Sequence, residues 1–194
     1  MENFLNVLQL HTPITQQIID DIYKGATKRY FRARVRILSP NEDQGSLLFV
    51  NSGITRNFYK SEKKEWTSKF CQAGDFVMSV DNFLFDLPCK ELIETCTPAE
   101  FIEIPKKNYL QLLLDHPELN IVVRNITSLH LRLGINRMYS WQMQSALERY
   151  HSFVQQHPDL YKNVQLQHIA SYLGISPYNL SRIRKQYKNG CHLQ

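Results

Sequence analysis

A helix-turn-helix pattern occupies residues 168–184, "HIASYLGISPYNLSRIR", near the end of the chain. Ala170 supplies the small side chain that two crossing helices need, and Gly174 tolerates the positive φ of a tight turn. Ser176 can cap a second helix, in which Pro177 suits the first position. Apolar residues at helical spacing would lock the two helices together: Ile169, Leu173, Ile175, Leu180 and Ile183. The pattern predicts a device for reading DNA, and the alternative is a purely structural helix pair.

The second helix of this pair carries the candidate base-reading side chains. In DNA-binding helix pairs this helix enters the major groove, with its first residues against the base edges. Arg182 could pair bidentately with guanine, which discriminates against other bases by about 1–3 kcal/mol, and Asn179 could pair with adenine or a phosphate. Lys185 and Lys188 are expected to contact phosphates, which positions a protein on DNA without specifying sequence. The full predicted DNA-binding set is Gln165, Gln167, Ser176, Pro177, Tyr178, Asn179, Ser181, Arg182, Lys185 and Lys188.

The distribution of charge favours a polyanionic partner for this end of the chain. Residues 1–115 hold 14 basic and 15 acidic side chains, whereas residues 116–194 hold 9 basic and 3 acidic ones. No acidic residue follows Asp159. A basic half beside a nearly neutral half indicates binding to a nucleic acid, with a merely solvated basic surface as the alternative.

Composition indicates a globular cytoplasmic protein and gives no sign of an enzyme. The chain has 194 residues, 43% of them hydrophobic, and lacks the run of about 18 apolar residues that a membrane span needs. Its four cysteines (71, 89, 96 and 191) show neither a C-x-x-C motif nor metal-finger spacing, so we expect reduced thiols. The histidines are scattered, and no nucleophile–base pair stands out. We therefore predict no catalytic site, no metal and no cofactor.

The first 115 residues read mainly as short strands separated by turns. A helix is expected over 14–25, capped by Thr12 or Thr15. Strict alternation in "FRARVRIL" predicts one half-buried strand over 31–38. Further strands are expected over 47–60, with a break at 51–53, then over 66–80, with a turn at 73–75, and over 97–105. Many short strands at such spacing predict a compact antiparallel barrel or roll.

A long helix is expected after the strands. Apolar side chains step alternately by three and four residues along 117–143, which is typical of a two-stranded coiled-coil seam. The predicted dimer seam is Val122, Ile126, Leu129 and Leu133. The alternative is a helix packed on its own domain. A capping box from Ser145 to Glu148 then predicts a short helix ending near His157.

This order of a roll, a long helix, a short helix and a helix-turn-helix resembles the Crp–Fnr superfamily of bacterial transcription regulators. The stretch 147–185 is similar to its DNA-binding end, and 47–59, 63–77 and 96–109 are similar to strands of its sensor domain. The resemblance implies an α+β fold class, with an N-terminal antiparallel β-roll (a double-stranded β-helix of the cyclic-nucleotide-binding type) and a C-terminal winged-helix or helix-turn-helix domain.

The resemblance also divides the chain and names its partners. It implies a sensor domain over 1–116, a dimerisation helix over 117–143 and a DNA-binding domain over 144–194. The protein would then be a cytoplasmic homodimer on a near-palindromic operator in double-stranded DNA. RNA polymerase would be a further partner if the protein activates transcription.

The sensor departs from the family pattern at the residues that bind cyclic nucleotides. The family's Gly-Glu pair falls on Met78 and Ser79, and its phosphate-binding Arg followed by Ser or Thr falls on Cys89 and Lys90. Ser79 is uncharged, and Lys90 is a point charge one position out of register. Because burying a phosphate without a cation is costly, we expect no binding of cyclic AMP. These four residues remain the candidate pocket for an unidentified effector. The alternative is a ligand-free roll that serves for dimerisation and protein interaction.

Overall fold

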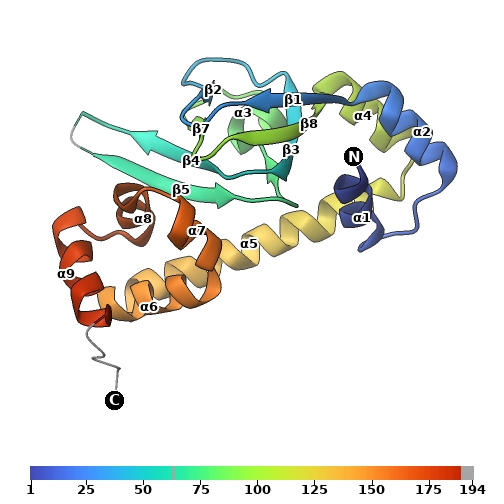
Figure 1. Cartoon of the computed structure of the whole chain (residues 1–194). Helices are drawn as coiled ribbons and strands as arrows, with labels where there is room; N and C mark the ends of the chain where they lie inside the picture. Colours follow the sequence, from blue (N-terminus) through green and yellow to red (C-terminus); the bar gives the residue numbers. More distant parts are fainter. Residues whose placement is uncertain (63, 189–194) are drawn as a thin grey trace.

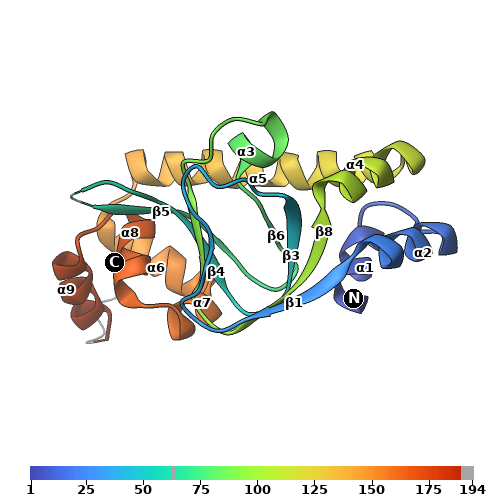
Figure 2. The ribbon, with the colours of Figure 1, turned by 90° about the horizontal axis from the view of Figure 1, so that it is seen from above.

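The computed structural model describes residues 1–62 and 64–188, in which an antiparallel β-roll lies beside one long helix (Figure 1). Seen from above, the long helix α5 (Leu119–Met143) runs along the whole roll (Figure 2). The N-terminal helices lie at one end of the molecule and the last four helices at the other. This arrangement confirms the predicted α+β fold class. The exact domain boundaries stay a prediction.

Two four-stranded antiparallel sheets form the roll, in the orders β1-β8-β3-β6 and β2-β7-β4-β5. The strands are β1 (Thr27–Phe31), β2 (Arg36–Leu38), β3 (Ser46–Ser52), β4 (Thr55–Lys60), β5 (Glu65–Cys71), β6 (Phe76–Val77), β7 (Leu92–Thr95) and β8 (Ala99–Pro105). Strands β4 and β5 form an antiparallel hairpin, in which Lys60 pairs with Glu65. Strand β5 is an edge strand, so its outer backbone groups are not paired with another strand.

The prediction of one continuous strand over 31–38 is wrong. The chain leaves β1 after Phe31 and enters β2 at Arg36, and these two strands belong to different sheets. Arg34 takes a positive φ of 63° at this corner, and its amide donates to the carbonyl of Thr95 at 2.8 Å. An alternating pattern cannot reveal the corner, because side chains keep facing inward and outward alternately while the backbone changes sheets.

The strand expected up to residue 80 is shorter than predicted. It ends at Val77, and the short helix α3 (Val80–Phe85) begins directly after Ser79. The Ser79 amide donates to the side-chain oxygen of Gln44 at 2.6 Å, so this amide is not free to continue a sheet.

Three helices pack around the end of the roll that carries the N-terminus: α1 (Glu2–Gln9), α2 (Gln16–Gly25) and α4 (Lys106–Asp115). The predicted cap of α2 is confirmed, because the Thr15 hydroxyl accepts from the Ile18 amide at 3.3 Å. Buried apolar side chains from these helices, from the roll and from α5 form one core, including Phe4, Leu8, Ile22, Phe49, Phe83 and Ile102.

The two halves of α5 have different surroundings. Leu119 and Val122 lie in the core of the roll, and Val122 is only 3% exposed. Val122 therefore cannot face a partner as part of the predicted seam, because its own domain covers it. Ile126 is partly buried against the same core, whereas Leu129 and Leu133 are exposed. The exposed apolar side chains of the second half are Leu129, Leu131, Leu133, Ile135, Met138, Tyr139 and Met143.

The last part of the chain is helical throughout its described residues: α6 (Ala146–Gln156), α7 (Pro158–Asn163), α8 (Leu166–Leu173) and α9 (Pro177–Lys188). The capping box is confirmed, with the Ser145 amide 2.7 Å from the Glu148 carboxylate. Between 144 and 188 no strand is present, so the predicted wing has no counterpart there. Cys191 lies outside the described residues. No helix within 1–62 and 64–188 is both long and apolar enough to cross a membrane.

Candidate nucleic-acid interface and sensor cavities

Helices α8 and α9 form the helix-turn-helix that the sequence predicts. Gly174 takes the left-handed conformation, with φ 66°, and the Ile175 amide closes the turn on the Ala170 carbonyl at 2.9 Å. Ala170 and Leu180 are completely buried where the two helices cross. The Ser176 hydroxyl accepts from the Asn179 amide at 3.2 Å and so caps α9. The locking residues named from the sequence all lie in one core cluster with α6 and α7: Ile169, Leu173, Ile175, Leu180 and Ile183.

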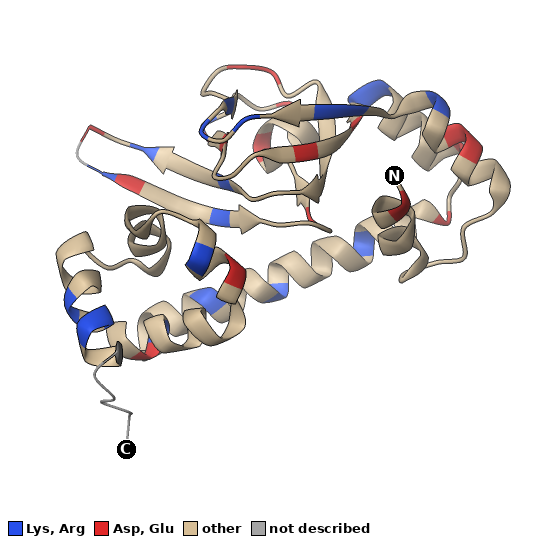
Figure 3. Ribbon diagram, viewed as in Figure 1, with Lys and Arg blue, Asp and Glu red and all other residues tan. Residues whose placement is uncertain are grey.

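The outward face of α9 is open to solvent. The predicted residues on it are all exposed: Pro177, Tyr178, Asn179, Ser181, Arg182 and Lys185. Tyr178 alone is 79% exposed. Within the described residues, Arg182 and Lys185 form no ion pair, so their charges are available to an outside partner (Figure 3). The side chain of Lys188 lies outside the described part of the chain.

Two further predicted residues, Gln165 and Gln167, are exposed at the start of α8. Their amide side chains are hydrogen-bonded to each other at 2.9 Å. Arg184, in contrast, points back into its own domain, because its guanidinium lies 5.6 Å from the centre of the Tyr161 ring. Its hydrogen bond with Tyr161 raises its pKa above the ordinary value.

Helix α8 is held against the edge of the roll. The Ser171 hydroxyl accepts from the Thr67 amide at 2.8 Å and donates to the Glu65 carbonyl at 2.8 Å. A helix side chain thereby satisfies the outer groups of edge strand β5. Figure 1 shows α8 lying directly beneath this hairpin. Sequence reasoning missed this contact, since a single serine in a helix gives no signal of its distant partner.

A buried ionic cluster lies in the roll, next to the contact between α8 and β5. Arg56 is 3% exposed, and it reaches Glu94 at 2.6 Å and Glu65 at 2.8 Å. Its guanidinium also lies 3.8 Å from the centre of the Phe58 ring. His168 of α8 is close to this cluster. Burial, with Arg56 nearby, lowers the pKa of His168 to about 4, so its ring is neutral at pH 7.

The structure does not bring the four predicted sensor residues into one pocket. Ser79 and Cys89 are each only 1% exposed, and the Cys89 thiol donates to the Glu91 carbonyl at 3.3 Å. Lys90 is exposed to solvent, and Met78 lines a separate apolar cavity. Side chains of the roll itself therefore occupy the region in which the sequence placed an effector.

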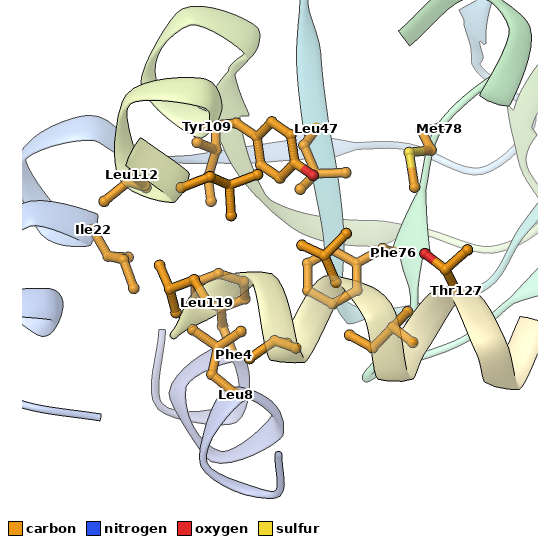
Figure 4. Close-up of a pocket in the computed structure, with 15 residues that line it drawn as sticks. Phe4, Leu8, Ile22, Leu47, Phe76, Met78, Tyr109, Leu112, Leu119 and Thr127 are labelled. Carbon is orange, nitrogen blue, oxygen red and sulfur yellow. The ribbon is translucent and has the colours of Figure 1, made fainter. Parts of the chain in front are cut away.

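The apolar cavity next to Met78 lies between α1, α4, α5 and the roll (Figure 4). Its volume is about 70 Å³, and Phe4 and Leu8 of α1 form one wall. Tyr109 and Thr127 bring the oxygen atoms visible among the labelled side chains. Because an engineered cavity that takes up benzene measures about 150 Å³, this space is too small for a nucleotide.

No family model and no curated protein sequence matches the chain. The chain is similar in fold to many solved structures, among them three that match it over most of its length at 16–19% identity. The global regulator CLP of Xanthomonas campestris, described as c-di-GMP-responsive, has a TM-score of 0.72 and 19% identity, with 93% of this chain and 96% of that chain covered. A CooA mutant from Carboxydothermus hydrogenoformans has a TM-score of 0.71 and 16% identity, with coverage of 96% and 84%.

A protein from Eubacterium rectale, described as a transcriptional regulator of the Crp/Fnr family, has a TM-score of 0.74 and 17% identity. The match covers 93% of this chain and 88% of that one. This chain has the Crp–Fnr fold. The coverage includes both the roll and the helix-turn-helix, so the Crp–Fnr likeness concerns the whole arrangement and not one domain.

Among the described residues, no group of three or more His, Cys, Asp or Glu side chains is placed to hold a metal ion. Of the features on the Crp–Fnr fold, the exposed face of α9 is the one whose chemistry points most directly to a partner.

Proposed function

We propose that this protein is a sequence-specific DNA-binding transcription regulator of the Crp–Fnr type. The observation that carries the proposal is the open face of α9. Its inner side chains are buried in the helix-turn-helix core, whereas Tyr178, Asn179 and Arg182 are exposed at its start. A helix with this arrangement can enter the major groove without unfolding any part of its own domain.

Different side chains of α9 would read base edges and neutralise phosphates. Arg182 lies near the start of the helix and would read a guanine edge. Lys185 lies one turn further and would neutralise a phosphate, as would Lys188. The excess of basic residues after residue 115 would add a sequence-independent attraction that weakens with salt.

A homodimer is the second part of the proposal. The second half of α5 exposes an apolar face that includes Leu131, Ile135 and Met138, which follow one another at helical spacing. This face would pair with its copy in a second chain, whereas Leu129 and Leu133 of the predicted seam lie on the opposite side of the helix. Two-fold symmetry would then place two recognition helices on a near-palindromic site, with half-site centres about 34–36 Å apart.

The roll is proposed not to bind cyclic AMP. Ser79 and Cys89 are buried by their own domain, and neither could neutralise a cyclic phosphate. Titration calorimetry with cyclic AMP and cyclic di-GMP tests this, and we expect no binding of cyclic AMP tighter than about 1 mM. Micromolar binding of cyclic AMP would contradict the electrostatic argument. A roll without any ligand, acting as an interaction scaffold, remains the second candidate.

Selection of bound sequences from a random pool of duplex DNA tests the DNA-binding proposal. The wild-type protein should enrich a two-fold symmetric motif. The double variant Tyr178→Ala with Arg182→Ala should keep its fold, since both side chains are exposed, and should lose the enrichment. If the wild-type protein enriched no sequence, specific DNA recognition would be refuted.

A further inference from the structure

A second and larger cavity lies between the roll, the long helix and the DNA-binding helices. Its volume is about 640 Å³, which is within the range of small-molecule sites. Its walls come from β5, the second half of α5, and α6 to α8, elements that Figure 1 shows around the same part of the molecule. None of the four predicted effector residues (Met78, Ser79, Cys89 and Lys90) lines this cavity.

Three cations line the cavity: Lys69 of β5, Arg137 of α5 and Arg149 of α6. None of them lies within ion-pair distance of a carboxylate among the described residues. Asp75 is the one carboxylate in the described lining, and it accepts from the Gln72 amide at 2.8 Å. The lining therefore has an excess of positive charge.

The hydrogen bonds of these cations leave their charge uncompensated. Arg149 donates to the carbonyls of Leu173 at 3.0 Å and Gln144 at 2.6 Å. Lys69 donates to the Phe76 carbonyl at 3.2 Å and lies 3.4 Å from the ring nitrogen of His130. Carbonyl groups and a neutral imidazole satisfy donors but carry no negative charge.

Arg137 is partly buried, as the other two cations are. It donates to the carbonyls of Ser68 and Thr67. Burial lowers the pKa of its guanidinium, which reflects the cost of keeping a charge away from water. An anion in the cavity would recover part of that cost, because charge-assisted hydrogen bonds are stronger than neutral ones.

Aromatic rings supply the other wall. The guanidinium of Arg137 lies 4.6 Å from the centre of the Trp141 ring and 4.5 Å from that of Tyr172. Tyr172 in turn lies 5.1 Å from Phe70 and 5.8 Å from Phe153, measured between ring centres. A planar ring that entered the cavity would find aromatic faces to stack on, next to the positive charges.

We propose that this cavity binds an organic anion that carries a planar aromatic ring. Because its walls belong to the roll, to α5 and to the helices that carry the helix-turn-helix, an occupant would contact all three. On the proposed DNA-binding function, such an occupant would bias how the helix-turn-helix sits on the roll. Binding of the anion in the cavity does not depend on the proposed DNA-binding function.

The fluorescent dye 8-anilinonaphthalene-1-sulfonate, an aromatic anion, is a direct probe of the full-length protein. Lys69→Met and Arg149→Met should each weaken its binding about tenfold or more, since each removes a charge-assisted contact. Arg132→Met is the control, because Arg132 is exposed on α5, the helix that also carries Arg137, but does not line the cavity. That variant should bind the dye as the wild type does.

The uncharged analogue N-phenyl-1-naphthylamine separates this site from apolar surfaces elsewhere. Its binding should not respond to Lys69→Met or Arg149→Met, and thermal unfolding of both variants checks that they are folded. If the two variants bound the anionic dye as tightly as the wild type, the proposal would be overturned. This outcome is independent of any DNA measurement, so failure of the DNA proposal and failure of this one are distinguishable.

Competition identifies the source of the anion. Displacement of the dye by adenosine 5′-monophosphate but not by adenosine would support a nucleotide phosphate. Displacement by 4-hydroxybenzoate but not by phenol would support an aromatic carboxylate.

Discussion

The Thr67 amide of strand β5 donates a 2.8 Å hydrogen bond to the Ser171 hydroxyl of helix α8. These residues are 104 positions apart in the chain. The same hydroxyl donates to the Glu65 carbonyl, so one serine satisfies two backbone groups of edge strand β5. The first helix of the helix-turn-helix is thereby held against the roll in this conformation.

Ser171→Ala should loosen this contact. The Thr67 amide would lose its acceptor in a half-buried place, which costs about 1–3 kcal/mol. We expect a lower melting temperature and faster hydrogen exchange at the Thr67 amide, measured by nuclear magnetic resonance. Ser181→Ala is the control, because the Ser181 hydroxyl bonds only within its own exposed helix, to the Pro177 carbonyl at 3.0 Å. Unchanged exchange at Thr67 in the Ser171 variant would show that another group holds α8 in place.

Acid should destabilise the folded protein through His168 of helix α8. Its pKa falls to about 4 in the folded protein, against an ordinary value of 6.5, because of burial and the nearby charge of Arg56. Arg34 acts in the same direction, whereas Glu94 and Glu65 oppose it. Between pH 6.5 and about 4 the unfolded chain takes up a proton here and the folded chain does not. The contribution of this site to the free energy of unfolding must therefore decline as the pH falls through that window.

Melting temperatures of the wild type and of His168→Gln between pH 7 and 4 measure this contribution. The loss of stability with acid should be smaller in the variant. His11→Gln is the control, because the His11 side chain forms no hydrogen bond or ion pair among the described residues, and it should follow the wild-type curve. Parallel curves for His168→Gln and the wild type would assign the acid dependence to other groups.

The helix-turn-helix was predictable because its determinants are local. Ala170, Gly174 and Ser176 each meet a requirement of the backbone within a few residues, and the structure confirms all three. The features that the sequence did not reveal depend on distant contacts. Arg34 turns a corner because β1 and β2 join different sheets, and Ser171 caps a strand 104 residues away.

The dimer seam predicted on α5 could be foreseen from the sequence only in part. Its periodicity is visible in the sequence, but periodicity does not say what covers each side chain. Val122 proved to be covered by its own roll, whereas Leu133 is exposed. A heptad pattern that drifts around a straight helix can serve one neighbour in its first half and another in its second. The roles of the α9 residues stay predictions, since exposure shows that they are available but not what they contact.

Ile135→Asp should convert the proposed dimer into a monomer. Ile135 is 56% exposed in the single chain, so the variant should fold normally, but a dimer would bury an unpaired carboxylate from each chain. Sedimentation should show the monomer, with weakened DNA binding. Asn120→Asp, at an exposed position in the first turn of α5, should stay dimeric. In contrast, Leu119→Ala should destabilise the fold by about 2–5 kcal/mol without changing the oligomeric state. A dimeric Ile135→Asp would place the interface elsewhere.

Arg182 and Lys185 should separate base reading from phosphate neutralisation. Both side chains are exposed on α9, so replacing either with alanine should leave the melting temperature nearly unchanged. Arg182→Ala should weaken binding to the preferred operator by about 1–3 kcal/mol and relax the preference at one base pair per half-site. Lys185→Ala should weaken binding to all sequences alike. It should also lower the slope of log affinity against log salt by about two for a dimer that loses one phosphate contact per half-site. If Arg182→Ala changed only the salt slope and kept the sequence preference, base reading would pass to Tyr178 or Asn179.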